Sequence, residues 1–194
     1  MLKAKSLYHL IVYSILFIIV LISSFTFIII NNTHDELQEK IHTLKTDYTN
    51  NQKELIKNHV NYIINFIDYY NETFKDKKSQ AEIQKEILQT IEKLRVNQNP
   101  NEYIFIYDFN GKLIQDAVSK NNIGENFYNL KDINGKEVIK ELITTSQKKH
   151  GGYIEYVWYK PEISKQTNKI SYSLSYNKWN WTIGKGVYLD EIDK

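Results

Sequence analysis

The stretch NEYIFIYDFNGKLIQ, residues 101–115, decides the fold class of this chain. Aromatic residues alternate with isoleucines over 103–107, and this period of two is typical of a β-strand with different side chains on its two faces. The tetrapeptide DFNG at 108–111 is a turn signal, because an Asn-Gly pair tolerates positive φ angles. The chain returns over 112–115, so the stretch predicts an antiparallel β-hairpin.

Three more strands are predicted downstream of this hairpin. They are GGYIEYVWYKP at 151–161, KISYSLSY at 169–176 and WNWTIGKGVY at 179–188. Pro161 ends the first of them, because proline has no N–H for the strand ladder. Five short antiparallel strands, with helices before and between them, predict an α+β fold. One face of the sheet is expected to be covered by helix and the other to be open for a ligand pocket.

The region before the hairpin, residues 33–95, contains no proline or glycine and has helical periodicity. Four apolar residues recur at coiled-coil spacing near its start: Leu37, Ile41, Leu44 and Tyr48. The pattern breaks at Asn51 and resumes with a wider apolar face, which indicates packing on a globular body. After an interruption at 71–73, a second amphipathic helix is expected through Leu94.

A short third helix is predicted at 135–147, within the set of strands. Asn134 can cap its start, with Glu137 three residues later as the reciprocal partner of a capping box. Its predicted buried face consists of Val138, Ile139, Leu142 and Ile143.

The N-terminus carries a long apolar run, with no charged residue from Leu10 to Ile30. At about 1.5 Å per residue the run is roughly 31 Å long as a helix, which matches one hydrocarbon core. A cleaved signal peptide is the alternative, but its apolar region would be shorter and would end in small residues. The run ends in FTFIIINN instead, which favours an uncleaved transmembrane anchor.

The flanking charges predict the orientation of this anchor. Lys3 and Lys5 precede the run, and the positive-inside rule places that end in the cytoplasm. The predicted organisation is therefore a cytoplasmic N-terminus (1–6), a transmembrane anchor (7–30) and an extracytoplasmic domain (31–194). Within the last of these, a helical stalk is expected over 33–70 and the sheet over 95–190.

Composition excludes several classes of function. Two of the 25 basic residues precede the apolar run, which leaves 23 against the 23 acidic residues that follow it. A neutral ectodomain argues against nucleic-acid binding. There is no cysteine, and none of the histidines (His9, His34, His42, His59 and His150) lies three or four residues from another, so no metal or cofactor is expected. No motif combines a nucleophile with its base, and we expect no enzymatic activity.

Gly184 and Gly186 flank a lysine inside a strand pattern, rather than at a turn between a strand and a helix. This placement favours close backbone approach across the strand over a phosphate-binding loop.

The ordered set of motifs resembles the single-Cache domain family of the second type. The motifs are LRVNQNPNEYIFIYDFNGKLI, then GGYIEYVWYKP, then KISYSLSYNKWNWTIGKGVYLDEI. The resemblance is dense over 95–192 and looser over the helices from residue 33. It implies a PAS-like sheet outside the membrane that binds a small molecule, usually between two membrane spans of a chemoreceptor, sensor histidine kinase or cyclic-nucleotide enzyme. The VYLDE segment at 187–191 would then start the helix that returns to the membrane.

One departure from the family pattern concerns the site. Many members carry His-Pro or a similar pair after the second strand, where this chain has QDAV at 115–118. Any ligand contact that the family makes at that point is therefore in doubt here.

The strand pattern and the resemblance together select eight candidate pocket residues: Arg95, Tyr103, Phe105, Tyr107, Tyr156, Trp158, Lys169 and Tyr172. Arg95 is the only arginine, and its rigid fork suits a carboxylate. Position alone would also fit an arginine at a helix C-terminus. The aromatic residues could be plain core, but buried tyrosine hydroxyls need partners, which suggests a polar-lined cavity.

Four further residues receive simpler roles. Lys160 is expected at the rim of the pocket, Trp179 and Trp181 in the core, and His150 in a turn.

The function predicted from these observations is a membrane-anchored extracytoplasmic sensor. Its ligand would be a short carboxylate or an amino-acid-like molecule, and its apolar stalk would pair with a second copy as a parallel homodimer. Binding would shift the sheet against the long helix. A membrane-tethered scaffold without a small-molecule ligand is the alternative, and a saturable change in stability with a small ligand would separate the two.

Overall fold

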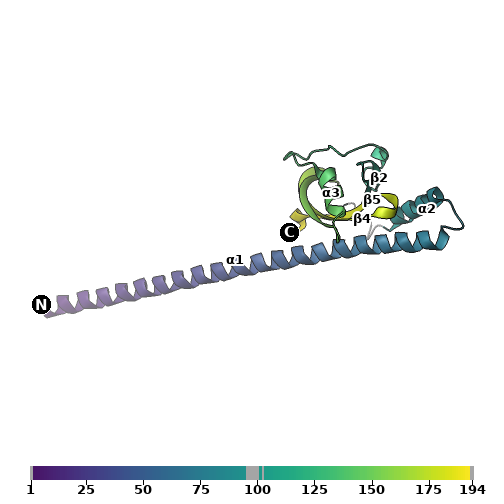
Figure 1. The fold of residues 1–194 in the computed structure, drawn as a ribbon. Helices are drawn as coiled ribbons and strands as arrows, with labels where there is room; N and C mark the ends of the chain where they lie inside the picture. Colours follow the sequence, from purple (N-terminus) through teal and green to yellow (C-terminus); the bar gives the residue numbers. More distant parts are fainter. Residues whose placement is uncertain (1, 95–100, 102, 193–194) are drawn as a thin grey trace. The chain divides into compact units, whose positions relative to one another are not determined.

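The computed structural model describes residues 2–94, 101 and 103–192 (Figure 1). The chain divides into two compact units, residues 1–47 and 48–194. Helix α1, Leu2–Phe74, contributes to both of them. The break in the apolar pattern at Asn51 does not interrupt the helix, because α1 passes through this position. Asparagine costs less than about 1 kcal/mol inside a helix, which is too little to end a helix whose following turns are buried.

The first unit holds the apolar run. This apolar run lies in a helix whose length and composition would allow it to cross a membrane. The most apolar part of that helix is not buried against the rest of the protein. A helix that is apolar on all sides and unburied fits membrane anchoring.

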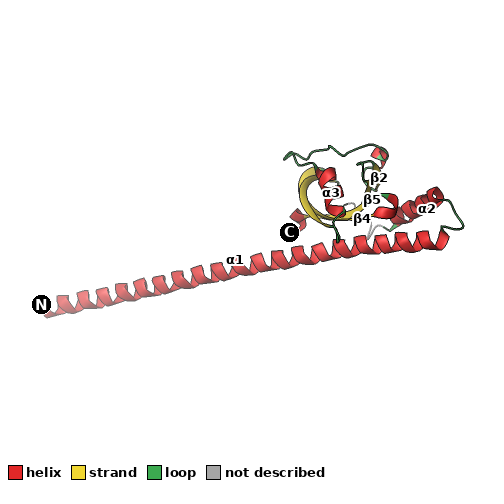
Figure 2. Cartoon of the chain, in the orientation of Figure 1, coloured by secondary structure: helices red, strands yellow, loops and turns green. Residues whose placement is uncertain are grey.

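The second unit is built on an antiparallel sheet, drawn in yellow in Figure 2. The sheet has five strands in the order β2-β1-β5-β4-β3. The strands are β1 (Ile104–Asp108), β2 (Leu113–Asp116), β3 (Gly152–Lys160), β4 (Lys165–Tyr176) and β5 (Trp181–Tyr188). The α+β prediction is confirmed. The predicted hairpin turn also forms: Gly111 has a φ of +86° and its N–H donates to the Asp108 carbonyl at 3.0 Å. Strand β3 ends immediately before Pro161, as expected.

One face of the sheet packs on the C-terminal part of α1 and on α2 (Gln80–Lys93). A full capping box starts α2, in which Ser79 and Glu82 satisfy one another's backbone N–H groups. The core on this face joins three sets of side chains: Ile56, Val60, Ile63 and Ile67 of α1; Ile83, Ile87 and Ile91 of α2; and Ile106, Tyr172, Tyr176, Trp179, Trp181 and Ile183 of the sheet region. Trp179 and Trp181 are therefore core residues, as predicted.

The other face is covered by helix α3, Val138–Ser146, so the prediction of an open face is wrong. The helix also begins later than predicted. Asn134 is not its cap, because the Asp132 carboxylate accepts the N–H groups of Asn134 and Lys136 at 2.9 Å each and forms a turn there. Gly135 completes this turn with a φ of +83°, and Glu137 is left as the residue before the helix.

Three 3-10 helices complete the described elements: η2 (Lys120–Asn122), η3 (Asn177–Trp179) and η4 (Leu189–Ile192). His150 lies in an exposed turn before β3, as predicted.

Candidate ligand-binding pocket

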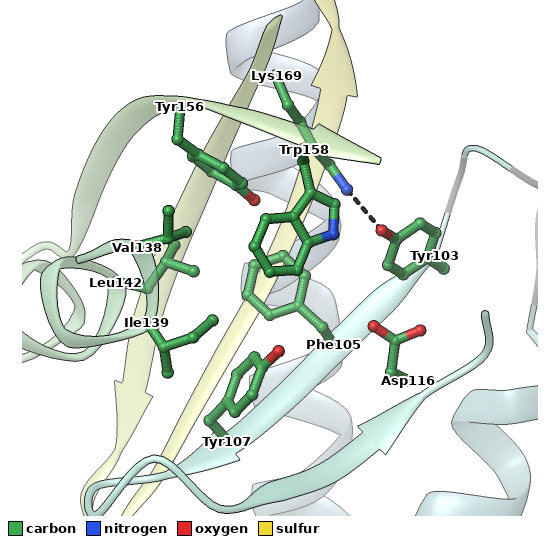
Figure 3. A pocket seen from close by; sticks show the side chains of 10 residues that line it. All are labelled: Tyr103, Phe105, Tyr107, Asp116, Val138, Ile139, Leu142, Tyr156, Trp158 and Lys169. Atoms are coloured by element: carbon green, nitrogen blue, oxygen red, sulfur yellow. Dashed lines mark hydrogen bonds between the residues drawn. The ribbon is translucent and has the colours of Figure 1, made fainter. Parts of the chain in front are cut away.

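A small cavity lies between the sheet and α3 (Figure 3). Its volume is about 10 Å³. Four strands and one helix supply the lining side chains: Tyr103, Phe105, Tyr107, Asp116, Val138, Ile139, Leu142, Tyr156, Trp158 and Lys169. A cavity of roughly this volume holds about one water molecule. The lining side chains would therefore have to move apart to admit any larger molecule.

The ammonium of Lys169 forms the basic end of the cavity. Its Nζ donates to the Tyr103 hydroxyl at 2.8 Å (Figure 3). The same Nζ lies 4.2 Å from the centre of the Tyr103 ring and 4.8 Å from the centre of the Tyr188 ring, which are cation–π distances. Lys169 is only 1% exposed, and no carboxylate of the described residues lies within ion-pair distance of it.

The carboxylate of Asp116 faces the same cavity from the end of β2 (Figure 3). Asp116 pairs with Phe105 across the β1–β2 ladder, which places the two side chains on one face. Its Oδ1 accepts the N–H groups of Val118 at 2.7 Å and Ser119 at 3.0 Å. The side chain is thus held in place by the loop that follows it.

Burial governs the protonation of these groups. It lowers the pKa of the Lys169 ammonium to about 7, while the negative charge of Asp116 acts in the opposite direction. Burial, and then the charge of Asp116, raises the pKa of Tyr103 and of Tyr107. Both tyrosines therefore remain hydroxyls that can donate hydrogen bonds to a ligand near neutral pH.

The remaining walls are aromatic and aliphatic. Tyr156 shares a hydrogen bond of 2.8 Å with the Ser171 hydroxyl, and its ring meets Trp158 edge-on at 5.6 Å. From α3, Val138, Ile139 and Leu142 close the opposite side (Figure 3). The cavity thus has a charged, hydroxyl-lined region and an apolar wall, as small-molecule sites usually do.

Two glycines of β5 make room for the pocket side chains. A Cβ atom on Gly184 would lie 2.3 Å from the Phe105 ring, and one on Gly186 would lie 2.7 Å from Cε of Lys169. Both side chains therefore cross β5 where it has no side chain of its own. This confirms that the two glycines permit close approach.

Six of the eight candidate residues line this cavity: Tyr103, Phe105, Tyr107, Tyr156, Trp158 and Lys169. Tyr172 does not, because it lies on the other face of β4. There its hydroxyl donates to the His150 carbonyl at 2.6 Å and its ring packs 5.0 Å from that of Tyr153. Arg95 lies outside the described residues. Lys160 is not at a rim but fully buried, with its Nζ 3.0 Å from both carboxylate oxygens of Asp190.

Four lining residues were not selected as pocket residues from the sequence: Asp116, Val138, Ile139 and Leu142. The three on α3 were recognised as a buried helix face, but the pattern could not show that this face borders a cavity. A signal for Asp116 did exist, since QDAV at 115–118 is where the chain departs from the family pattern. Among the described residues, no group of three or more His, Asp or Glu side chains could hold a metal ion.

A PAS-like sheet with a small pocket, following a helix that could span a membrane, defines a sensor-type ligand-binding domain. Residues 48–194 match the family described as Single Cache domain 2, and the chain belongs to that family. Domains of this family normally bind ligands rather than catalyse reactions.

Two curated relatives are signalling proteins. The sensor histidine kinase MctS of Rhizobium johnstonii is 40% identical over 90 residues, which cover 46% of this chain and 19% of MctS. The methyl-accepting chemotaxis protein McpP of Pseudomonas putida is 28% identical over 114 residues, which cover 59% of this chain and 21% of McpP. The chain thus spans about a fifth of the length of the relatives it matches. It is a Cache sensor domain of the kind found in chemoreceptors and histidine kinases.

Solved structures share the fold. A methyl-accepting chemotaxis protein from Vibrio parahaemolyticus is similar with a TM-score of 0.68 at 27% identity, over 79% of this chain and 99% of that one. A structure described as the basis for carboxylic acid recognition by a Cache chemosensory domain has a TM-score of 0.63 at 24% identity, over 76% of this chain and 97% of that one.

Proposed function

We propose that this chain is the sensor region of a receptor in the bacterial cytoplasmic membrane, and that it binds a short carboxylate or an amino-acid-like molecule. The observation that carries this proposal is the buried ammonium of Lys169 at one end of a small aromatic cavity. A buried charge is costly unless it is paired. The described partners of Lys169 are a hydroxyl and two ring faces, so an anionic ligand would supply the missing counter-charge.

The size of the cavity limits the ligand and its affinity. The best small ligands gain at most about 1.5 kcal/mol per heavy atom, so six atoms gain no more than roughly 9 kcal/mol. That ceiling corresponds to binding near the micromolar range. Tyr103 would offer a hydroxyl beside Lys169, and Trp158 would wall the apolar end.

The proposed topology has residues 1–6 in the cytoplasm and 7–30 in the membrane. Residues 31–194 lie outside the cytoplasmic membrane, in the periplasm or the extracellular space. Lys3 and Lys5 support this orientation. Leu37 and Ile41 are exposed in the structure, which leaves an apolar seam that a second copy could cover. We therefore propose a parallel homodimer in the membrane.

A ligand screen on the full chain in detergent micelles tests the proposal. Short monocarboxylates, dicarboxylates and amino acids would be compared by thermal shift, with amines and urea as non-acid arms. A ligand at 100 times its dissociation constant should stabilise the protein by about 2.7 kcal/mol. The carboxylic acid recognition described for one structural neighbour belongs to that protein and only sets the order of the screen.

The Lys169→Met variant separates pocket binding from nonspecific effects, since it should lose the response to every acid. Arg95→Ala tests whether Arg95 takes part. If only amines or urea stabilise the wild type, the carboxylate proposal fails while a sensor function survives. If no compound produces a saturable shift, a scaffold without a ligand is the better description.

A further inference from the structure

The part of α1 that belongs to the second unit, residues 48–74, has two contrasting faces. One face packs into the core shared with α2 and the sheet, which lie on one side of this part of α1 in Figure 1. Its buried residues are Ile56, Val60, Ile63 and Ile67. Since successive helical residues are about 100° apart, positions such as 58, 62 and 65 point away from this core. These positions are exposed.

The exposed face forms a narrow stripe without a charged residue. Its members repeat at alternating intervals of three and four positions: Tyr48, Asn51, Leu55, Asn58, Tyr62, Asn65 and Tyr69. Tyr62 and Tyr69 have 69% and 72% of their surfaces exposed. A helix face that meets only water normally carries charged side chains. The charged residues of this stretch lie off the stripe: Lys53, Glu54, Lys57 and Asp68.

The spacing of the stripe is that of a coiled-coil seam. The aromatic and aliphatic members recur every seven residues, and the asparagines recur every seven residues between them, which gives the a and d positions of a heptad. The same two series run back along the sequence to Leu37 and Ile41. The seam therefore continues past Asn51, with asparagine at one of its two positions. Polar residues in a seam cost stability and specify how the helices pair.

The asparagines indicate that the partner is a second copy of this chain. An amide side chain is both a donor and an acceptor, so it can form hydrogen bonds with the same side chain of another copy. A two-fold interface uses the same surface patch on both subunits. A purely apolar partner would instead leave three amides without hydrogen bonds. Because an anchor in one membrane gives both copies the same orientation, the two helices would be parallel.

We propose that residues 48–69 of α1 form a parallel, in-register seam between two sensor domains, in which Asn51, Asn58 and Asn65 each pair with their own counterparts. The inference rests on the parallel homodimer proposed above and extends that dimer from the stalk to the sensor domain. The ligand pocket lies on the other face of the sheet, under α3, so this seam leaves both pockets uncovered.

Disulfide crosslinking of single-cysteine variants tests the seam. The chain contains no cysteine, so each substitution introduces its only thiol. Leu55→Cys, Tyr62→Cys and Tyr69→Cys would be made in the full chain, oxidised mildly in membranes and resolved on a non-reducing gel. Asn50→Cys is the matched control, because Asn50 is exposed but lies about 200° around the helix from Tyr48.

We expect each seam variant to give about fivefold or more disulfide-linked dimer than the control. A disulfide requires Cα atoms within about 7 Å of one another, which only facing positions reach. An antiparallel pair would bring at most one of the three positions onto its own copy. Crosslinks at all three therefore define the parallel register.

A charge placed on the seam tests the role of the asparagines. In the Tyr62→Cys background, Asn58→Asp would set two like charges against each other across the two-fold axis. The yield of crosslinked dimer should fall about fivefold or more. Asn50→Asp in the same background is the control, and it should leave the yield unchanged.

The outcomes separate this inference from the proposed stalk dimer. If Leu37→Cys crosslinks while the sensor-domain positions do not exceed Asn50→Cys, the stalk dimer stands and the seam is refuted. No crosslink at Leu37 or at any seam position would overturn both. A crosslink at only one seam position, or a disulfide-linked band of another mass, would replace the parallel seam with a different pairing. Unchanged crosslinking in Asn58→Asp would show that the asparagines do not face their own copies.

Discussion

Replacing Lys169 with methionine should make the ligand-free protein more stable at neutral pH while abolishing its response to acids. Burial lowers the pKa of Lys169 from 10.5 to about 7 in the folded protein. Since a pKa difference of one corresponds to about 1.36 kcal/mol, protonated Lys169 costs the folded state roughly 5 kcal/mol. Methionine is also unbranched and flexible, so it can occupy the same space without a charge.

The sign of the pH dependence follows from this lowered pKa. Between about pH 7 and 10.5 the unfolded chain binds the proton more tightly than the folded one, so wild-type stability rises with pH. The cost of Lys169 is complete below pH 7, remains roughly 4 kcal/mol at pH 7 and falls by roughly 3 kcal/mol by pH 9.5. In the variant, the Tyr103 hydroxyl loses its hydrogen-bond partner, which destabilises the folded state by about 1–3 kcal/mol. The variant should thus be more stable by about 1–3 kcal/mol at pH 7, and this advantage should shrink towards pH 9.5.

Urea denaturation, followed by tryptophan fluorescence at several pH values, measures both quantities. The other groups that titrate in this range are the same in both proteins. The difference in the free energy of unfolding between variant and wild type therefore reports the effect of Lys169. Lys148→Met serves as the control, because Lys148 is exposed and should show no such trend. A Lys169→Met variant that is less stable than wild type by a constant amount from pH 7 to 9.5 would refute the reasoning.

Three further predictions follow from the packing of the pocket and the stalk. Gly186→Ala should destabilise the protein by about 1–3 kcal/mol in a urea titration, because the new Cβ would lie 2.1 Å from the Ser171 hydroxyl; unchanged stability would contradict the tight crossing. Ile139→Phe should fill the cavity and abolish the thermal shift with acids at a cost of at most about 3 kcal/mol, whereas retained binding would place the ligand elsewhere. Cysteines at Leu37 or Ile41 should crosslink two copies in membranes, and no crosslink at either position would count against the parallel dimer.

Several features could be predicted from the sequence because they depend on neighbours along the chain. The alternation over 103–107 places its aromatic residues on one face, since successive side chains of a strand point to opposite sides. The Asn-Gly turn and the end of β3 at Pro161 are also local, because φ angles and missing N–H groups act within a few residues. The same alternation puts Lys169 and Tyr172 on opposite faces of β4. The sequence alone could therefore have excluded Tyr172 from a pocket that Lys169 lines.

Contacts between distant segments were decided only by the tertiary structure. Tyr103 and Lys169 are 66 residues apart and meet because β5 lies between their strands and carries glycine where the side chains cross. Strand order and register depend on the whole sheet, and a period of two does not specify which strands become neighbours. The register of β2 on β1 pairs Asp116 with Phe105 and thereby places Asp116 on the pocket face. Helix α3 covers this face, which was expected to be open. The sequence could therefore suggest many of the lining residues but not the cavity itself, because the cavity exists only where five separate elements meet.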